Sequence, residues 1–221
     1  MGKYKNGATG AFSGKLGNII GSHWRNIDYM RSRPDHVSNP NTPAQQKQRG
    51  KFALIVQFLK KFKPVIRAGF DKTSTNRSSF NGAISYNLKN AVMGEVPDQQ
   101  IDYPAVMVTR GDLYPPEGAV ALSENPGEIT FTWETNNLMG SASPDDEAVI
   151  LLYNSTKERA LYIAEDGPQR SEQTYTVTVP ASHQGDDMEV YLSFVSADGE
   201  EVSSSVYLGS VTVKKEQEPE V

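Results

Sequence analysis

The spacing of apolar residues changes near residue 101, from three or four residues to two. The first spacing is typical of helices, and the second is typical of strands that are buried on one side. Polar turns such as ENPG and ADGEE separate the alternating segments, which lie at 105–109, 119–122, 129–134, 148–154, 160–164, 174–179, 188–196 and 204–213. Seven or eight short strands at this spacing predict an antiparallel β-sandwich of the immunoglobulin or fibronectin type III kind. We expect Trp133 to face its interior, and Tyr191 is a candidate for the tyrosine found near the penultimate strand of such sandwiches.

A long helical pattern precedes these strands, in the segment TPAQQKQRGKFALIVQFLKKFKPVIRAGF at residues 42–70. Thr42 is the expected cap, and Pro43 follows at the first helical position, where its missing N–H costs nothing. The expected buried stripe comprises Phe52, Ile55, Val56, Phe58, Leu59 and Phe62. Pro64 is expected to kink or end the helix. A second helix is expected in the segment SSFNGAISYNLKNAVMG, so the predicted fold class is α+β.

Six glycines punctuate the first 21 residues of the chain. Helices do not tolerate so much glycine, so we expect extended segments that are joined by tight turns. An arm of this kind cannot bury a core by itself, and its apolar side chains need cover from the following helix or from a neighbouring subunit. The candidate assembly residues are Phe12, Ile19, Ile20, Trp24 and Tyr29. The expected parts are a glycine-rich extended arm and linker at 1–41, a basic helical region at 42–98, the β-sandwich at 99–214 and a charged tail at 215–221.

Charge is distributed unevenly along the chain. Residues 1–95 contain sixteen Lys and Arg against four acidic residues, whereas residues 96–221 contain six against twenty-three. This asymmetry indicates either that the two halves have different roles or that basic and acidic surfaces attract each other between copies. Basic residues interleaved with aromatic ones also suit nucleic acid, because the cations follow phosphates while the rings stack on bases. The candidate anion or nucleic-acid contacts are Lys15, Arg25, Arg31, Arg33, Lys47 and Lys51.

The sequence offers no catalytic constellation. Cysteine is absent, which excludes disulfides, thiol catalysis and cysteine-bound zinc. The segment GATGAFSGK has Thr9 where a phosphate-binding loop needs glycine and Leu16 where it needs Ser or Thr. The three histidines lie in different segments without the spacing of a metal site, and no GxSxG motif occurs. We therefore expect no metal, no cofactor and no enzymatic activity.

No apolar run approaches the roughly 18 residues that a membrane span needs. The N-terminus, MGKYKNGATG, has no apolar segment resembling a signal peptide. We expect synthesis in the cytoplasm, and incorporation into a virion or an extracellular assembly stays open.

Several motifs taken together resemble one protein family. They are GATGAFSGKLGNIIGSHW, RSRP, TPAQQKQRGKFALIVQFL, FNGAISYNL and IDYPAVMVTRGDL, and they cover most of the chain. This combination is similar to a widespread family of Bacteroidota proteins of unknown function. The resemblance implies the same layout of glycine arm, helical middle and immunoglobulin-like end, and it assigns no catalytic residue.

The leading hypothesis is a non-enzymatic structural or interaction protein that assembles through its N-terminal arm and displays a β-sandwich. Such a protein would be a subunit of a fibre, a shell or a phage virion, and its partner another copy or a second assembly protein. One alternative is a nucleic-acid-associated protein that binds through the basic half. Another is a carbohydrate- or surface-binding module that uses the loops of the sandwich, which is an analogy of fold alone.

Overall fold

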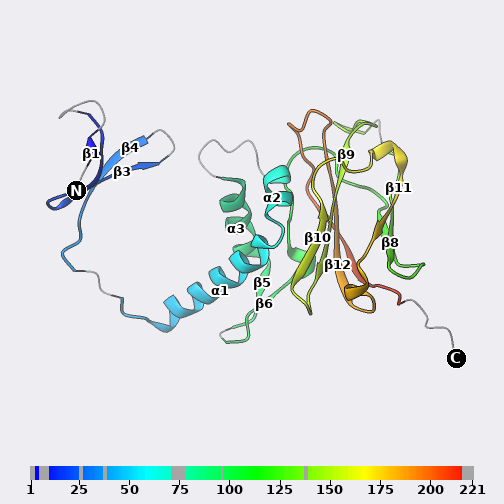
Figure 1. The fold of residues 1–221 in the computed structure, drawn as a ribbon, viewed down its shortest axis with the longest axis horizontal. Coiled ribbons are helices and arrows are strands. Elements are labelled where there is room, and N and C mark those ends of the chain that lie inside the picture. The colour runs from blue at the N-terminus through cyan, green and yellow to red at the C-terminus, as the bar shows by residue number, and fades with distance from the viewer. Residues whose placement is uncertain are drawn as a thin grey trace. The chain divides into compact units, whose positions relative to one another are not determined.

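The computed structural model describes residues 3–4, 10–24, 27–36, 39–70, 78–95, 97–136 and 139–215. The chain forms two compact units, Met1–Thr42 and Pro43–Val221. The first unit is a small sheet, and the second, called the body here, contains the helices and the β-sandwich (Figure 1). Within the described residues, no helix combines the length and the apolar character that a membrane span requires.

The N-terminal unit is an antiparallel sheet whose strands follow the order of the sequence. Its strands are β1 (Lys3–Tyr4), β2 (Phe12–Leu16), β3 (Ile19–Trp24) and β4 (Ile27–Ser32). A two-residue turn joins β2 to β3, and Gly17 takes its first position with φ of +58°. Glycine is favoured there because other residues rarely adopt a positive φ. The extended segments expected from the glycine pattern thus form one continuous sheet.

Three helices form one layer of the body. They are α1 (Pro43–Lys60), α2 (Lys63–Gly69) and α3 (Ser79–Asn90). The first begins at Pro43, as predicted, and the helical segment predicted at 42–70 is divided into α1 and α2. The chain leaves the helical conformation at Phe62, where φ is −132°, and Pro64 then lies in the first turn of α2, where a missing N–H is tolerated. Phe52 is predicted to be buried, but half of its surface is exposed, because the buried residues of α1 are Ile55, Phe58 and Leu59.

Seven strands make a sandwich of two antiparallel sheets, which confirms the predicted fold class. The strands are β7 (Val120–Leu122), β8 (Glu128–Thr132), β9 (Glu147–Asn154), β10 (Arg159–Ile163), β11 (Thr174–Thr178), β12 (Asp187–Val195) and β13 (Val206–Thr212). One sheet has the order β11-β8-β7 and the other β10-β9-β12-β13. Short pieces complete the body, namely β5 (Val92–Met93), β6 (Gln100–Ile101), and the 3₁₀ turns η1 (Tyr103–Ala105), η2 (Arg170–Glu172) and η3 (Ala181–His183).

The strand predicted at 105–109 is wrong. This segment begins at the end of η1, and the amides of residues 107–109 donate to side chains instead of a ladder. The amide of Met107 donates to Oδ1 of Asn87 at 2.9 Å, and the amide of Val108 donates to Oγ of Ser205 at 3.0 Å. Side-chain acceptors of this kind offer the backbone an alternative to sheet pairing.

Strand β9 is buried on both faces and separates two cores. Ile150 and Leu152 point into the sandwich, where Trp133 is also buried as predicted. Leu151 and Tyr153 point to the opposite side, where the helices cover the sheet. The body therefore has three layers, with helices, the four-stranded sheet and the three-stranded sheet in that order. The helical region expected at 42–98 and the sandwich expected at 99–214 share one core cluster and lie in one compact unit.

Tyr191 lies on the penultimate strand β12, but it faces the helical layer and not the sandwich interior. Its hydroxyl donates to the carbonyl oxygen of Tyr103 at 2.9 Å. The contact joins β12 to η1, which lies 88 residues earlier in the chain. The tyrosine common near this strand in such sandwiches bonds a few residues upstream, so Tyr191 has a different role and fastens the helical layer.

Candidate interaction surface

The register of the N-terminal sheet assigns its side chains to two faces. Residues directly opposite each other share a face, and Gly21 pairs with Gly14 and with Met30, while Ile20 pairs with Lys15 and with Arg31. The first face therefore carries Phe12, Leu16, Ile19, His23, Asp28 and Met30. The second face carries Lys15, Ile20, Trp24, Ile27, Tyr29 and Arg31. Both faces combine apolar with charged side chains.

Close packing on the first face is confined to one spot. A Cβ atom at Gly21 would lie 2.8 Å from the ring of Phe12, so this ring occupies the space that a side chain would need. Gly21 is buried, whereas Leu16, Ile19 and Met30 lie among the exposed large apolar residues. An aromatic ring over a glycine holds two strands together, yet it leaves most of the face open to solvent.

The second face carries basic side chains in one row and aromatic side chains towards the other end of the strands. Trp24 is 49% exposed, Ile27 is 57% exposed and Tyr29 is 46% exposed. Lys15 and Arg31 lie on the same face, and both are exposed. Such a face can bury apolar area against a partner while its cations meet carboxylates, phosphates or aromatic rings.

The sheet brings the five candidate assembly residues together but divides them between the faces. Phe12 and Ile19 lie on the first face, and Ile20, Trp24 and Tyr29 lie on the second. The same sheet exposes three further apolar residues that are not among the five candidates, namely Leu16, Ile27 and Met30. The alternation of side chains along the strands on either side of the turn at Gly17 is the sequence signal that predicts these residues.

The six basic candidates are more scattered. Lys15 and Arg31 lie on the second face, and Arg33 directly follows β4 and is exposed. Arg25 lies outside the described residues. Lys47 and Lys51 belong to α1 of the body, and Nζ of Lys47 forms an ion pair with Glu95 at 2.5 Å. The hydrogen bond and charge of Lys47, aided by Lys51, lower the pKa of the Glu95 carboxyl.

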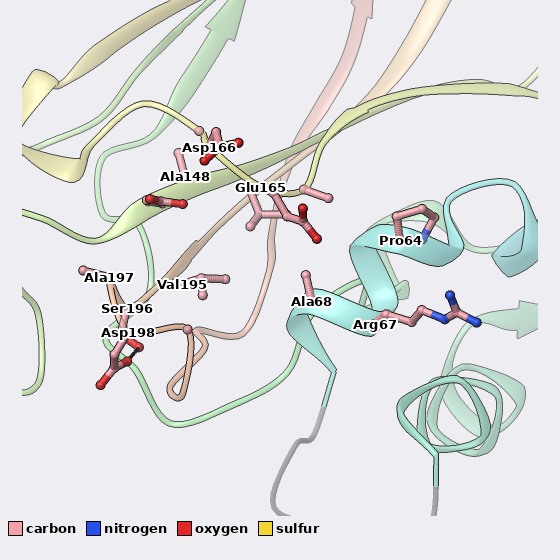
Figure 2. Close-up of a pocket in the computed structure, with 15 residues that line it drawn as sticks. Pro64, Arg67, Ala68, Ala148, Glu165, Asp166, Val195, Ser196, Ala197 and Asp198 are labelled. Carbon is pink, nitrogen blue, oxygen red and sulfur yellow. Dashed lines mark hydrogen bonds between the residues drawn. The ribbon is translucent and has the colours of Figure 1, made fainter.

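A cavity of about 610 Å³ lies at one end of the body. It is lined by α2, by the start of β9 and by the turns that follow β10 and β12 (Figure 2). Glu147, Glu165, Asp166 and Asp198 make its lining acidic, and Arg67 extends from α2 away from them.

The acidic cavity contains no serine paired with a histidine or lysine. Its one hydroxyl belongs to Ser196, which donates to Oδ1 of Asp198 at 2.6 Å, and no histidine or lysine lies among the lining residues. Oγ of Ser196 also accepts from the amide of Glu201 at 2.9 Å. The hydroxyl therefore fastens the turn after β12, and no histidine or lysine of the lining is placed to activate it. Among the described residues, no group of three or more His, Asp or Glu side chains is arranged to hold a metal ion.

The body is thus a fibronectin type III-like sandwich with a helical layer, and it is joined to a small sheet that exposes apolar side chains. The chain belongs to a family of unknown function, DUF6266, whose model matches residues 11–209. This match confirms the resemblance to an uncharacterised family. Its expected occurrence in Bacteroidota stays a prediction.

Comparison with solved structures gives similarity to fibronectin type III domains. The fn3 domain of human collagen alpha-1(XX) chain has a TM-score of 0.36 at 12% identity, and the match covers 49% of this chain and 91% of that domain. The fn3 domain of human contactin 1 has a TM-score of 0.35 at 11% identity, covering 51% of this chain and 87% of that domain. The search of curated proteins found no match.

Proposed function

We propose that this protein is a non-enzymatic structural or interaction protein that self-assembles through its N-terminal sheet and displays its body as a subunit of a fibre, shell or virion. The partner is another copy or a second protein of the same assembly. The observation that carries the proposal is the exposure of six large apolar side chains on one unit of 42 residues. These residues are Leu16, Ile19, Trp24, Ile27, Tyr29 and Met30.

The two units differ in how much apolar surface they bury. The body has two core clusters of its own, and no described residue of the N-terminal sheet belongs to either. Three of the six exposed apolar side chains lie on each face of the sheet, and apolar side chains gathered on an exposed surface in this way often mark contact sites. Covering six half-exposed side chains contributes roughly 5–9 kcal/mol, half of the value for full burial. That gain supports association through the sheet.

Charge supports the same proposal. The sheet carries Lys15, Arg31 and Arg33, while the sandwich contains most of the acidic residues of the chain. Complementary surfaces of this kind steer encounters between copies and suppress wrong arrangements. We therefore expect assembly to weaken in high salt without disappearing, since apolar contact is not screened.

The test is the absolute mass of the full chain by light scattering, compared with two double variants. We expect a species larger than the 24.3 kDa monomer. Trp24→Ser with Tyr29→Ser should reduce the mass. The matched control, Val120→Ser with Leu122→Ser, removes side chains of similar exposure from β7 of the body and should not. A monomeric full chain, or assembly that survives both the double variant and deletion of residues 1–33, would refute the proposal.

One observation favours nucleic-acid binding as a second candidate function. The register places Lys15 and Arg31 on the same face as Trp24 and Tyr29, which is the combination that binds single strands. Fluorescence anisotropy with a single-stranded oligonucleotide should then show affinity that falls steeply with salt. Replacing Lys15 and Arg31 by Gln should make the negative slope of log affinity against log salt shallower, by about 0.7 for each phosphate that is no longer neutralised. Absent or salt-insensitive binding would remove this candidate.

A further inference from the structure

The outer edge of β4 is an open pairing surface. β4 is the last strand of the N-terminal sheet, and all six of its residues are exposed. Its ladder with β3 has an unbroken register, without the bulge that often protects an edge. Pro34, which would block pairing, comes only after the strand ends. At the opposite edge of the same sheet, the described residues of β1 are Lys3–Tyr4.

Hydrogen-bond direction along β4 follows from two contacts. The amide of Arg33 donates to the carbonyl oxygen of Asn18 at 2.6 Å, in the register that pairs Arg31 with Ile20. Amides of an antiparallel strand point alternately to either side. The amides of Tyr29 and Arg31 therefore point to β3, whereas the amides of residues 28, 30 and 32 point away from β3, towards the open edge of the sheet. The turn at residues 17–18 agrees, because it directs the amide of Ile19 to β2 and that of Ile20 to β4.

The outward groups of β4 are self-complementary. A two-fold axis normal to the sheet pairs two copies of β4 in antiparallel orientation, and residues opposite each other then share a face. Because side chains alternate between faces along a strand, two opposite residues must both have odd numbers or both have even numbers. Centred on Met30, this arrangement places Asp28 opposite Ser32 of the second copy, so that the outward amides and carbonyls meet. Tyr29 then lies opposite Arg31 of the second copy, on the second face. No like charges oppose each other, and each ring faces a guanidinium, which is favourable by about 0.5–1 kcal/mol at an exposed site.

We propose that β4 pairs antiparallel with β4 of a second copy, centred on Met30, so that two N-terminal sheets join into one continuous sheet. This inference rests on the proposed function and specifies its contact. Covering both faces of the sheet would contribute roughly 5–9 kcal/mol by burial, which edge pairing by itself does not supply, while association costs about 4–15 kcal/mol. Side-chain contact alone is therefore marginal. Edge pairing adds backbone hydrogen bonds and fixes the register, as in other cases of strand addition.

Cysteine cross-linking tests the register, because the full chain contains no native cysteine. Hydrogen-bonded antiparallel pairs have Cα atoms about 5.5 Å apart, within the range of a disulfide. Met30→Cys in the full chain should form a reducible dimer in a glutathione redox buffer. Met93→Cys, on the body, is the matched control, because it also replaces an exposed methionine. Tyr29→Cys should cross-link more slowly than Met30→Cys, since the proposed register places it opposite Arg31.

A proline variant tests the edge without cysteine. Met30→Pro removes an outward amide and should lower the mass of the assembly, while Arg31→Pro removes an inward amide and should also open the β3–β4 ladder. Hydrogen exchange at Ile20 and Tyr29, whose amides belong to the β3–β4 ladder, reports whether the sheet is intact in each variant. If Met30→Cys cross-links no better than Met93→Cys while the mass still depends on the N-terminal sheet, the edge pairing is wrong and the proposed function stands. A full chain that is monomeric throughout overturns both.

Discussion

The guanidinium of Arg170 donates from Nε to Oδ2 of Asp146 across 2.9 Å, with both side chains withdrawn from solvent. Its other donors reach Oδ1 of Asn136 at 2.6 Å and the carbonyl oxygen of Tyr114 at 2.7 Å. The ring of Phe194 lies 3.8 Å from the guanidinium carbon. Arg170 thus ties η2 to the connections that precede β7, follow β8 and precede β9, which fixes one end of the sandwich.

Removing this arginine should destabilise the body severely. Arg170→Met leaves the charge of Asp146 buried without its partner, and breaking a buried pair in this way typically costs about 3–5 kcal/mol. The loss is measured as the change in free energy of unfolding by urea. Arg159→Met, which replaces an exposed arginine on β10, is the control and should change little. A loss below about 1 kcal/mol for Arg170→Met would contradict a buried ion pair at this position.

Replacing both partners distinguishes charge burial from packing. In the double variant Arg170→Met, Asp146→Leu no unpaired charge remains, and buried pairs often tolerate such a swap. The double variant should therefore be more stable than the sum of the two single losses predicts. Because Asn136 and Tyr114 also lose a donor, it should not recover the full stability of the parent. Strictly additive losses in the double-mutant cycle would show that the two side chains are not coupled.

Alkaline pH should weaken the contact between helices and sheet. Burial raises the pKa of Tyr103 to about 12 and that of Tyr153 to about 12, and the rings lie 5.9 Å apart. Burial also raises the pKa of Tyr191 and Tyr207. An unfolded tyrosine titrates near pH 10. The neutral hydroxyls therefore contribute stability that is fully present below about pH 10 and is lost as pH rises towards 12.

Urea unfolding at a series of pH values, with tyrosinate absorbance recorded in parallel, checks this prediction. The urea midpoint should be constant around neutrality and fall above about pH 10. Tyr153→Phe should flatten the fall, whereas Tyr162→Phe, an exposed tyrosine on β10, should not. A midpoint that stays constant up to pH 12 would mean that these hydroxyls ionise as easily in the folded state as in the unfolded one.

The helices and the sandwich should unfold together, because one core cluster contains both. Phe58 of α1 packs against Phe62 at 4.9 Å and against Tyr153 of β9 at 4.8 Å between ring centroids. Phe58→Ala should cost about 3–5 kcal/mol, as large-to-small changes in a core do. Phe52→Ala, on the exposed part of the same helix, should cost far less.

Two probes show whether this loss is shared by the whole body. Circular dichroism follows the helices, and Trp133 fluorescence, isolated by Trp24→Phe, follows the sandwich. Both signals should shift by the same amount in Phe58→Ala and stay coincident. Loss of the helical signal at a lower urea concentration than the fluorescence change would separate the helical layer from the sandwich.

Local sequence patterns predict the helices and strands of this chain better than they predict which residues these elements contact. The start of α1 at Pro43 and seven of the strands follow from capping and from period-two alternation. The strand expected at 105–109 fails because Asn87 and Ser205, both distant in the sequence, bond its backbone. The uninterrupted apolar run of β9 is typical of a strand that is buried on both sides. It therefore indicates that the face of the four-stranded sheet opposite the sandwich interior is covered, as the helices cover it.

The interaction surface shows the same limit. Glycine content predicts extended segments, but the five candidate residues fall on two faces because the turn at Gly17 sets the register. Charge alone groups Lys47 with the cations of the arm. Its partner Glu95 lies 48 residues away, and only the folded chain brings the two together. Faces and ion pairs depend on register and tertiary contact, which the composition of a segment does not encode.

Gly21 provides the sharpest test that the two units are independent. A Cβ atom at this position would collide with the carbonyl oxygen of Phe12, and the backbone of β2 must shift to admit it. Gly21→Ala should therefore loosen the pairing of β2 with β3, seen as faster hydrogen exchange at Ile19, whose amide points to β2. Ser22→Ala, at the next position of the same strand, should leave the exchange rates unchanged.

The same variant should leave the body intact, because the body forms a separate compact unit with its own cores. Its urea midpoint should match that of the parent chain, while the mass of the assembly falls. Unchanged exchange at Ile19 would show that β2 does not pass close enough to Gly21 to exclude a methyl group. A lowered midpoint of the body together with a reduced mass would show that the sheet, once assembled, stabilises the body as well, because contacts made only by the native assembly raise apparent stability by mass action.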